Sequence, residues 1–205
     1  ITISSTGNGS DFGNLTNSTR LCGLLSNATR AIRVSGANPS TNIMDYWTMA
    51  SSGDAVDFGD VTTSDSHWSS CVSNPTRGVW AAGAASNNII EFITIASTGD
   101  GQDFGDLLAT QAGHFGLSSP TRAIFAGGRD NPNTGAVRES IDMHEIATTG
   151  NAIDFGDLAQ ENTNACGGNS STTRAVFAAG YEYPADGQTD RLQFVIMSSS
   201  GGAVD

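Results

Sequence analysis

The residues of this chain best suited to chemistry are three cysteines and three histidines. Cys22, His114 and Cys166 each stand eight residues before an arginine that follows a threonine. Two cysteines and one histidine form a donor set that zinc accepts, provided that all three reach one ion. The fourth equivalent position holds Ser69, and equivalent positions of a repeat usually lie too far apart for shared coordination. We therefore expect no metal site, and free buried thiols at these cysteines and at Cys71.

The histidines share no common place in the sequence pattern. His67, His114 and His144 differ in their distance from the nearest Thr-Arg pair, so they imply no shared catalytic geometry. His144 lies in an apolar segment, which favours a packed structural side chain over a general base. Nucleophile elbows, phosphate-binding loops and paired catalytic carboxylates are absent from the sequence. These observations predict no catalytic residue, no cofactor and no enzymatic activity.

Closely spaced aspartates raise the possibility of a calcium loop. Asp100, Asp103 and Asp106 resemble the spacing of such a loop, and a second set with the same spacing begins at Asp54. Asp and Asn are also the usual residues of tight hairpin turns. We interpret both sets as hairpin chemistry.

Composition limits the fold and the partners. The 205 residues include 25 glycines and only 15% charged side chains, which is typical of a turn-rich β protein. The formal net charge of −12 disfavours nucleic acid and anionic lipid as partners, because both carry negative charge. No apolar run reaches the ~18 residues of a membrane helix. We therefore predict no nucleic-acid partner and no membrane insertion.

Two motifs recur four times in constant order. Asp-Phe-Gly-(Asp/Asn)-(Leu/Val) begins at Asp11, Asp57, Asp103 and Asp154. Thr-Arg followed by a short apolar run that ends in glycine has its arginine at Arg30, Arg77, Arg122 and Arg174. The first motif recurs after 46, 46 and 51 residues. This period predicts one domain over residues 1–205, with repeats at approximately 1–46, 47–92, 93–143 and 144–194 and the start of a fifth at 195–205.

The repeated charges suggest a structural role. A residue required once in every repeat is normally part of the repeat itself. We expect each repeated arginine to be substantially buried and bonded to acid or backbone oxygens. The interpretation we favour for the partner is a repeated aspartate of its own or the next unit. The alternative is that the four arginines line a surface for acidic ligands.

Each unit contains four apolar segments of strand length, here named strands a to d. In the third unit and its flanks, strand b covers residues 123–126 and strand d carries the Asp-Phe-Gly motif. Strand c, as in residues 89–95, is apolar on both faces, which predicts a strand covered by a neighbouring sheet on each side. The sequence therefore predicts all-β architecture with four-stranded antiparallel units.

Length varies in one connection only, the one between strands b and c. It is longer in the last two units, at residues 129–140 and 181–191. Variation confined to one side of a repeat is typical of a working face. Tyr181 and Tyr183 are the aromatic candidates for ligand binding there.

Several segments resemble the kelch repeat. They are the strand end Phe125-Ala126-Gly127-Gly128, the strand c segment Ile90-Glu91-Phe92, and Phe104-Gly105-Asp106-Leu107 of strand d. Phe stands where kelch repeats usually carry Trp. The resemblance implies a β-propeller with about four blades present. Because residues 195–205 align with residues 1–11, we expect a segment of a longer array and a ring of five or more blades.

The segments from Ile95 to Leu107 and from Ser118 to Gly128 together are similar to repeats in structural or tail-fibre proteins of marine tailed phages. This resemblance covers essentially the whole chain and implies a virion or extracellular location. It also implies other virion proteins or a host-surface glycan as partners, and an oligomeric or longer assembly. It transfers no site residues.

Two functions of different kinds follow from these observations. The first is a non-enzymatic structural or adhesion module of a viral particle. The alternative is a glycan-binding propeller lectin in which Tyr181 and Tyr183 stack on sugar rings. A metal-dependent enzyme on a kelch-like scaffold is the third and least favoured possibility.

Overall fold

The computed structural model describes residues 6–63, 69–81, 83, 87–130, 136–160, 162–163, 167–182 and 187–204. In these ranges every regular element is a β-strand, and the strands form four antiparallel sheets of four strands each. The expectation of an all-β chain with four-stranded antiparallel units is therefore confirmed. The described ranges include no helix with the length and apolar character needed to cross a membrane.

The first two sheets each contain strands a to d in chain order. Sheet I consists of β1 (Gly23–Ser26), β2 (Arg30–Gly36), β3 (Thr41–Thr48) and β4 (Val56–Asp60), and sheet II consists of β5 (Ser70–Ser73), β6 (Arg77–Ala81), β7 (Ile89–Thr94) and β8 (Gln102–Asp106).

The third sheet repeats this order and the fourth departs from it. Sheet III consists of β9 (Phe115–Ser118), β10 (Arg122–Ala126), β11 (Ser140–Glu145) and β12 (Ile153–Asp157), and sheet IV consists of β13 (Asn162–Thr163), β14 (Gly167–Ser170), β15 (Arg174–Glu182) and β16 (Gly187–Ile196). In sheet IV both β13 and β14 pair with the same edge of β15, and β16 pairs with the other edge. Val204 forms an isolated bridge with Phe194 where strand d would lie.

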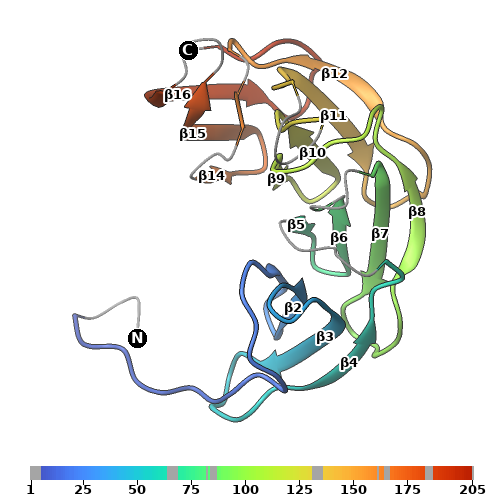
Figure 1. The fold of residues 1–205 in the computed structure, drawn as a ribbon, viewed down its shortest axis with the longest axis vertical. Coiled ribbons are helices and arrows are strands. Elements are labelled where there is room, and N and C mark those ends of the chain that lie inside the picture. The colour runs from blue at the N-terminus through green and yellow to red at the C-terminus, as the bar shows by residue number, and fades with distance from the viewer. Residues whose placement is uncertain are drawn as a thin grey trace.

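The four sheets follow one another along an arc (Figure 1). Strands β5, β9 and β14 lie on its inner side and β4, β8 and β12 on its outer side. Adjacent strands a contact each other, as β1 does β5 and β5 does β9. The arc is open between sheet IV and sheet I.

Separate apolar cores fill the spaces between neighbouring sheets. In sheet II, Ile90 and Phe92 pack toward sheet III, whereas Ile93 and Ile95 of the same segment pack toward sheet I. All four are buried. The prediction that strand c is covered on both faces is confirmed for this sheet, because an apolar neighbour lies on each side.

The Asp-Phe-Gly motif forms an outer seam between sheets. The backbone carbonyl of Phe58 in β4 accepts a hydrogen bond from the Gly99 N–H of the next sheet at 2.8 Å, and Asp60 accepts one from Gly101 at 2.8 Å. Gly59 has a φ of +143°, and a Cβ there would overlap the Gly99 carbonyl. The motif therefore needs glycine for both its conformation and its close backbone approach.

The repeated arginines form a second seam, and the prediction that they bond to acid or backbone oxygens is confirmed for three of them. The favoured pairing with a repeated aspartate is wrong. Arg30, Arg77 and Arg122 donate from Nη1 to a strand c carbonyl of the next sheet, at 3.0, 2.9 and 2.9 Å. These carbonyls belong to Ile95, Ile146 and Met197 respectively. The three arginine side chains are half-buried, whereas Arg174 is exposed, so substantial burial was also overestimated.

The repeated aspartates lie elsewhere because the motif runs along the outer edge of each sheet. Asp11, Asp57, Asp103 and Asp154 are all exposed. Asp11 accepts the N–H of Gly13, and Asp154 accepts that of Gly156. These two carboxylates therefore shape the local backbone. An aromatic ring of strand c lies against three of the repeated guanidinium groups: Arg30 lies over Tyr46 and Arg77 over Phe92, each at 4.7 Å, and Arg174 lies over Phe194 at 4.5 Å.

A third seam joins the inner strands through serine. Ser73 Oγ donates to the Ser26 carbonyl at 2.7 Å, Ser118 Oγ to Ser73 at 3.0 Å, and Ser170 Oγ to Ser118 at 2.6 Å. Each serine stands four residues before a repeated arginine. One hydroxyl per sheet thus ties each strand a to its predecessor.

Buried polar side chains of strand c complete the connections. Glu91 accepts the backbone N–H of Thr62 at 2.8 Å, Asp142 that of Leu108 at 2.9 Å, and Gln193 that of Ala159 at 2.7 Å. Each accepting side chain lies in the sheet after the donor, so it fixes the chain segment that leaves strand d. Burial raises the pKa of Asp142, and the Leu108 N–H opposes this shift.

Candidate functional site

The connections between strands b and c lie together at one end of the sheets, here named the loop end. In sheet III, Arg129 forms bridges with Ala112 and Val137, so the expected loop at residues 129–140 begins and ends as a hairpin. In sheet IV, Glu182 pairs with Gly187 in an extension of β15 and β16. The expected loop at 181–191 is therefore partly strand, because backbone pairing continues beyond the common length of the unit.

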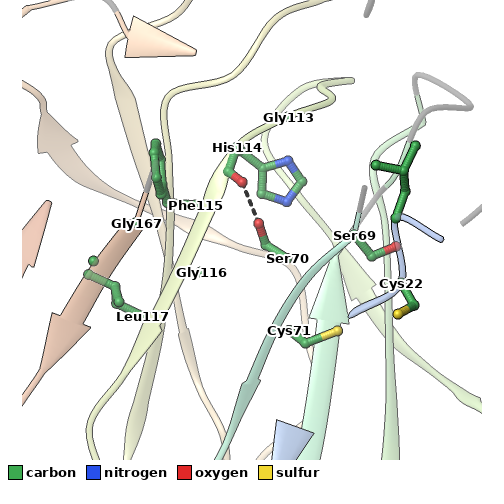
Figure 2. A pocket seen from close by; sticks show the side chains of 12 residues that line it. Cys22, Ser69, Ser70, Cys71, Gly113, His114, Phe115, Gly116, Leu117 and Gly167 are labelled. Atoms are coloured by element: carbon green, nitrogen blue, oxygen red, sulfur yellow. Dashed lines mark hydrogen bonds between the residues drawn. The ribbon is translucent and has the colours of Figure 1, made fainter. Parts of the chain in front are cut away.

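A cavity of about 570 Å³, here named the inner pocket, opens at the same end. Strands a begin there, because each runs antiparallel to a strand b that ends there. Figure 2 shows the side chains around it. The pocket is lined by Leu21, Cys22, Ser69, Ser70, Cys71, Gly113, His114, Phe115, Gly116, Leu117, Gly167 and Gly168.

Small residues set the walls of the inner pocket. A Cβ on Gly116 would lie 2.8 Å from Cγ1 of Val72 in the neighbouring sheet, and one on Gly168 would lie 3.2 Å from Cδ1 of Leu117. Gly23 is in contact with the Cys71 sulfur and leaves no room for a side chain. Gly167 differs, since a Cβ there meets no atom within 4 Å. Glycine therefore brings three strands together, and Gly167 alone borders open space.

His114 is the most deeply buried polar side chain of the pocket, at 5% exposure. Its ring contacts Phe125 edge to face, with centroids 5.6 Å apart. Neither ring nitrogen has a hydrogen-bond partner of good geometry among the described residues. Burial lowers the pKa of His114 to about 4, and the backbone of Ala81 opposes this shift. The imidazole is therefore neutral near pH 7.

The two cysteines of the pocket are free thiols, as the sequence predicted. Burial raises the pKa of Cys71, and the nearby Cys22 raises it further. A thiol with a raised pKa stays protonated and is a poor nucleophile. Both residues are partly covered, so their burial is less complete than the sequence predicted. Cys166 lies outside the described residues.

None of the described residues that line the inner pocket is a lysine, arginine, aspartate or glutamate. Its lining contains hydroxyls, thiols, one neutral imidazole, glycine backbone and apolar side chains. The Ser70 hydroxyl donates a hydrogen bond to the His114 carbonyl (Figure 2). Such a surface can accept a neutral ligand through hydrogen bonds and apolar contact, and its described residues offer no cation for a phosphate or carboxylate.

Tyr181 lies at the loop end, but its ring is partly covered. It belongs to β15, is half-buried, and has the Arg129 guanidinium over its ring at 5.6 Å. The contact joins the extended hairpins of sheets III and IV. Tyr183 lies outside the described residues.

The other candidates from the sequence are not assembled into a site. Across the part of the chain that the structure describes, no three His, Cys, Asp or Glu side chains are grouped to hold a metal ion. Asp100 accepts the N–H of Asp60 in the preceding sheet at 3.0 Å, so its carboxylate joins two sheets. His144 is buried in the interface of sheets II and III, against Phe104 at 5.6 Å. His67 lies outside the described residues.

A buried ion pair in sheet I was not anticipated. Arg33 and Asp45 are both fully buried, and Arg33 Nε donates to Asp45 at 3.1 Å. Asn17 accepts a further bond from the same guanidinium at 2.8 Å. Equivalent positions in the other sheets hold Trp80, Phe125 and Phe177. In the sequence, the signal for this ion pair is that Arg33 stands where the other repeats have an aromatic residue. The pair marks sheet I as a polar end of the array.

No family model matches the chain, and no curated protein matches it either.

Proposed function

We propose that this chain is a non-enzymatic binding module on a β-propeller scaffold of kelch-like repeats, working as a structural or adhesion part of a viral particle. The observation that carries the proposal is the coincidence of the inner pocket with the loop end. Variation in length and a ligand-sized cavity on one end of a regular scaffold are typical of a binding face.

The scaffold supports this role because four kinds of hydrogen-bonded seam join neighbouring sheets. Backbone, arginine, serine and strand c seams recur at successive interfaces with nearly constant geometry. Binding surfaces gain precision when rigid elements carry them. The virion setting comes from the resemblance to phage repeats described above and agrees with a strongly acidic surface that stays soluble in salt water.

The pocket chemistry supports binding over catalysis. A histidine with a pKa of about 4 is a weak base near neutral pH, and a protonated thiol is a weak nucleophile. General acid–base catalysis works best when the pKa of the group lies near the working pH. A neutral surface of this kind fits a host-surface glycan or an uncharged protein segment.

A glycan-binding lectin is the second candidate, and the neutrality of the pocket favours it. Tyr181 is half-covered by Arg129, so the pocket is a better sugar site than the tyrosine ring. The two functions differ in ligand and share the same face.

Gly167→Leu offers a direct test of the binding face. The side chain would enter open space at the pocket wall, so stability should stay within about 0.5 kcal/mol of the parent protein. Binding to host cells and to a glycan array should fall about tenfold or more. The control is Gly53→Leu, which also meets no atom within 4 Å but lies on a turn at the opposite end.

Unchanged binding by the Gly167→Leu protein would rule out the inner pocket as the site. Binding to cells without any binding to glycans would contradict the lectin and support a protein ligand. Parent protein that binds neither would contradict adhesion altogether.

A further inference from the structure

Two free cysteines face each other across the interface of sheets I and II. Cys22 stands just before β1 and Cys71 lies in β5, and both line the inner pocket. The two strands are in contact along the inner side of the arc. Figure 2 shows the two sulfur atoms turned toward one another. One wall of the inner pocket thus contains a pair of thiols, one from each sheet.

The backbone of sheet I approaches Cys71 as closely as a disulfide requires. A Cβ on Gly23 would overlap the Cys71 sulfur and would lie 3.5 Å from the Cys71 Cβ. In disulfides the two Cβ atoms lie about 3.5–4.5 Å apart. Gly23 has no side chain, and the thiol next to it along the chain is that of Cys22, which is near enough to raise the pKa of Cys71. The separation of the two strands therefore fits a bond between these sulfur atoms.

Cys22 has the freedom to complete this contact. It lies between the isolated bridge of Arg20 with Ala37 and the first pair of β1, Gly23 with Val34. In the part of the chain that the structure describes, no strand pair includes Cys22 itself. A disulfide needs a torsion of about 90° between its two sulfur atoms. The Cys22 side chain can turn toward this geometry without breaking a pair of the sheet.

The pair of thiols is particular to this interface. Cys22 stands eight residues before a repeated arginine, and Cys71 stands six residues before the next one. At the following two interfaces the corresponding residues are Ser69 with Gly116, and His114 with Gly168. The scaffold therefore forms without cysteine at either position, and a general need of the repeat does not explain why both occur together.

We propose that Cys22 and Cys71 form a reversible disulfide that joins sheets I and II at the inner pocket when a low-molecular-weight disulfide oxidant is present. The Cys22 thiolate attacks one sulfur of the oxidant, releases one thiolate and becomes a mixed disulfide. The Cys71 thiolate then attacks the Cys22 sulfur and releases the second thiolate. The two protons lost by the cysteines pass through solvent to the two released thiolates. Two protein thiols are thereby oxidised, and one oxidant disulfide is reduced to two thiols.

The order of attack follows from the surroundings of Cys71. Burial raises the pKa of this thiol, so its thiolate is scarce near pH 7, and we assign the first attack to Cys22. The resulting bond persists in oxidising surroundings and opens in reducing ones. One wall of the inner pocket thus responds to the redox state of its surroundings.

Peptide mapping of the full chain after treatment with oxidised glutathione tests the proposal. Trypsin cleaves after arginine and places Cys22, Cys71 and Cys166 in three different peptides, residues 21–30, 34–77 and 139–174. Remaining thiols are blocked with N-ethylmaleimide, and the monomer band of a non-reducing gel is digested. Mass spectrometry should find the first two peptides joined by one disulfide, and dithiothreitol should separate them.

Cys166→Ser is the matched control, because it removes the third cysteine and should leave the cross-link unchanged. The oxidised form of this variant should unfold at a temperature about 5–10 °C higher than its reduced form, since the bond closes a loop of about 50 residues. This comparison needs no substitution at the pair itself. Cys22→Ser and Cys71→Ser should each abolish both the cross-link and the gain in unfolding temperature.

Three results would overturn the proposal. The first is that the peptides of Cys22 and Cys71 remain separate after treatment with the oxidant. The second is a cross-link to the peptide of Cys166 in place of theirs. The third is an equal unfolding temperature for the oxidised and reduced forms of the Cys166→Ser protein.

Discussion

Phe104 and Phe12 occupy the same place in the same repeated motif and have opposite environments. Phe104 is 2% exposed and contacts Phe92 edge to face with centroids 5.7 Å apart. Phe12 is 41% exposed, and its motif has the outer seam but no sheet of its own. The difference teaches that a repeat of this chain is not an independent folding unit, because its core is completed by its neighbours.

The largest expected effect comes from removing these two rings in turn. Phe104→Ala leaves a cavity between sheets II and III and should lower the free energy of unfolding by about 3–5 kcal/mol. Phe12→Ala should lower it by less than about 0.5 kcal/mol. Urea unfolding of the two variants measures the difference. Similar losses would show that the terminal motif is as well packed as the interior one.

Acid should weaken the interface between sheets II and III, where His114 and His144 are buried. Burial lowers the pKa of each to about 4, against ~6.5 for histidine in the unfolded chain. The unfolded chain then binds more protons, so stability is lost as pH falls from 6.5 through 4. The loss should reach about 3 kcal/mol per histidine.

Urea unfolding at several pH values measures this loss, and the variant His144→Gln should show a shallower decline below pH 6.5. The equivalent positions in sheets II and IV are Ile93 and Val195, which do not titrate. A decline of equal steepness in the variant would mean that His144 is not the group being protonated.

A smaller contrast is expected at the repeated arginines. Arg77→Ala removes a charge-assisted bond to the Ile146 carbonyl and the stacking on Phe92, and should cost about 2 kcal/mol. Arg174→Ala removes stacking alone and should cost about 0.5 kcal/mol. Thermal and urea unfolding at dilute protein compare the two. Equal costs would mean that the carbonyl bond between sheets contributes nothing.

The serine seam gives the smallest contrast. Ser118→Ala removes the 3.0 Å bond to Ser73 and should cost about 1 kcal/mol. Ser26→Ala leaves the seam intact, since Ser26 takes part through its carbonyl, and should be nearly neutral. Urea unfolding of both variants checks this order. A reversed order would contradict the direction of the serine bonds.

Much of the architecture was predictable, because the repeat fixes the period and strand c is apolar on both faces. The apolar residues on both faces of this segment predicted a strand between two sheets. The structure places Ile90, Phe92, Ile93 and Ile95 there. The partner of the repeated arginines was predictable only as an acid or a backbone oxygen. A backbone carbonyl has no side-chain signature, so the sequence could not show which oxygen Arg77 would contact.

The candidate site was predictable only in part. The length of the connections indicated the working end, and Cys22, Ser69 and His114 were recognised as equivalent positions that the structure gathers around the inner pocket. The burial of His114 and the cover of Arg129 over Tyr181 could not be read from the sequence. Both depend on contacts between repeats whose connections have different lengths.

Hydrogen exchange of the four Asp-Phe-Gly segments tests the central claim most directly, namely that every repeat is completed by a neighbour. In dilute protein at low salt, the amides of residues 12–15 should exchange much faster than those of 58–61, 104–107 and 155–158. Equal protection of all four segments would contradict the account.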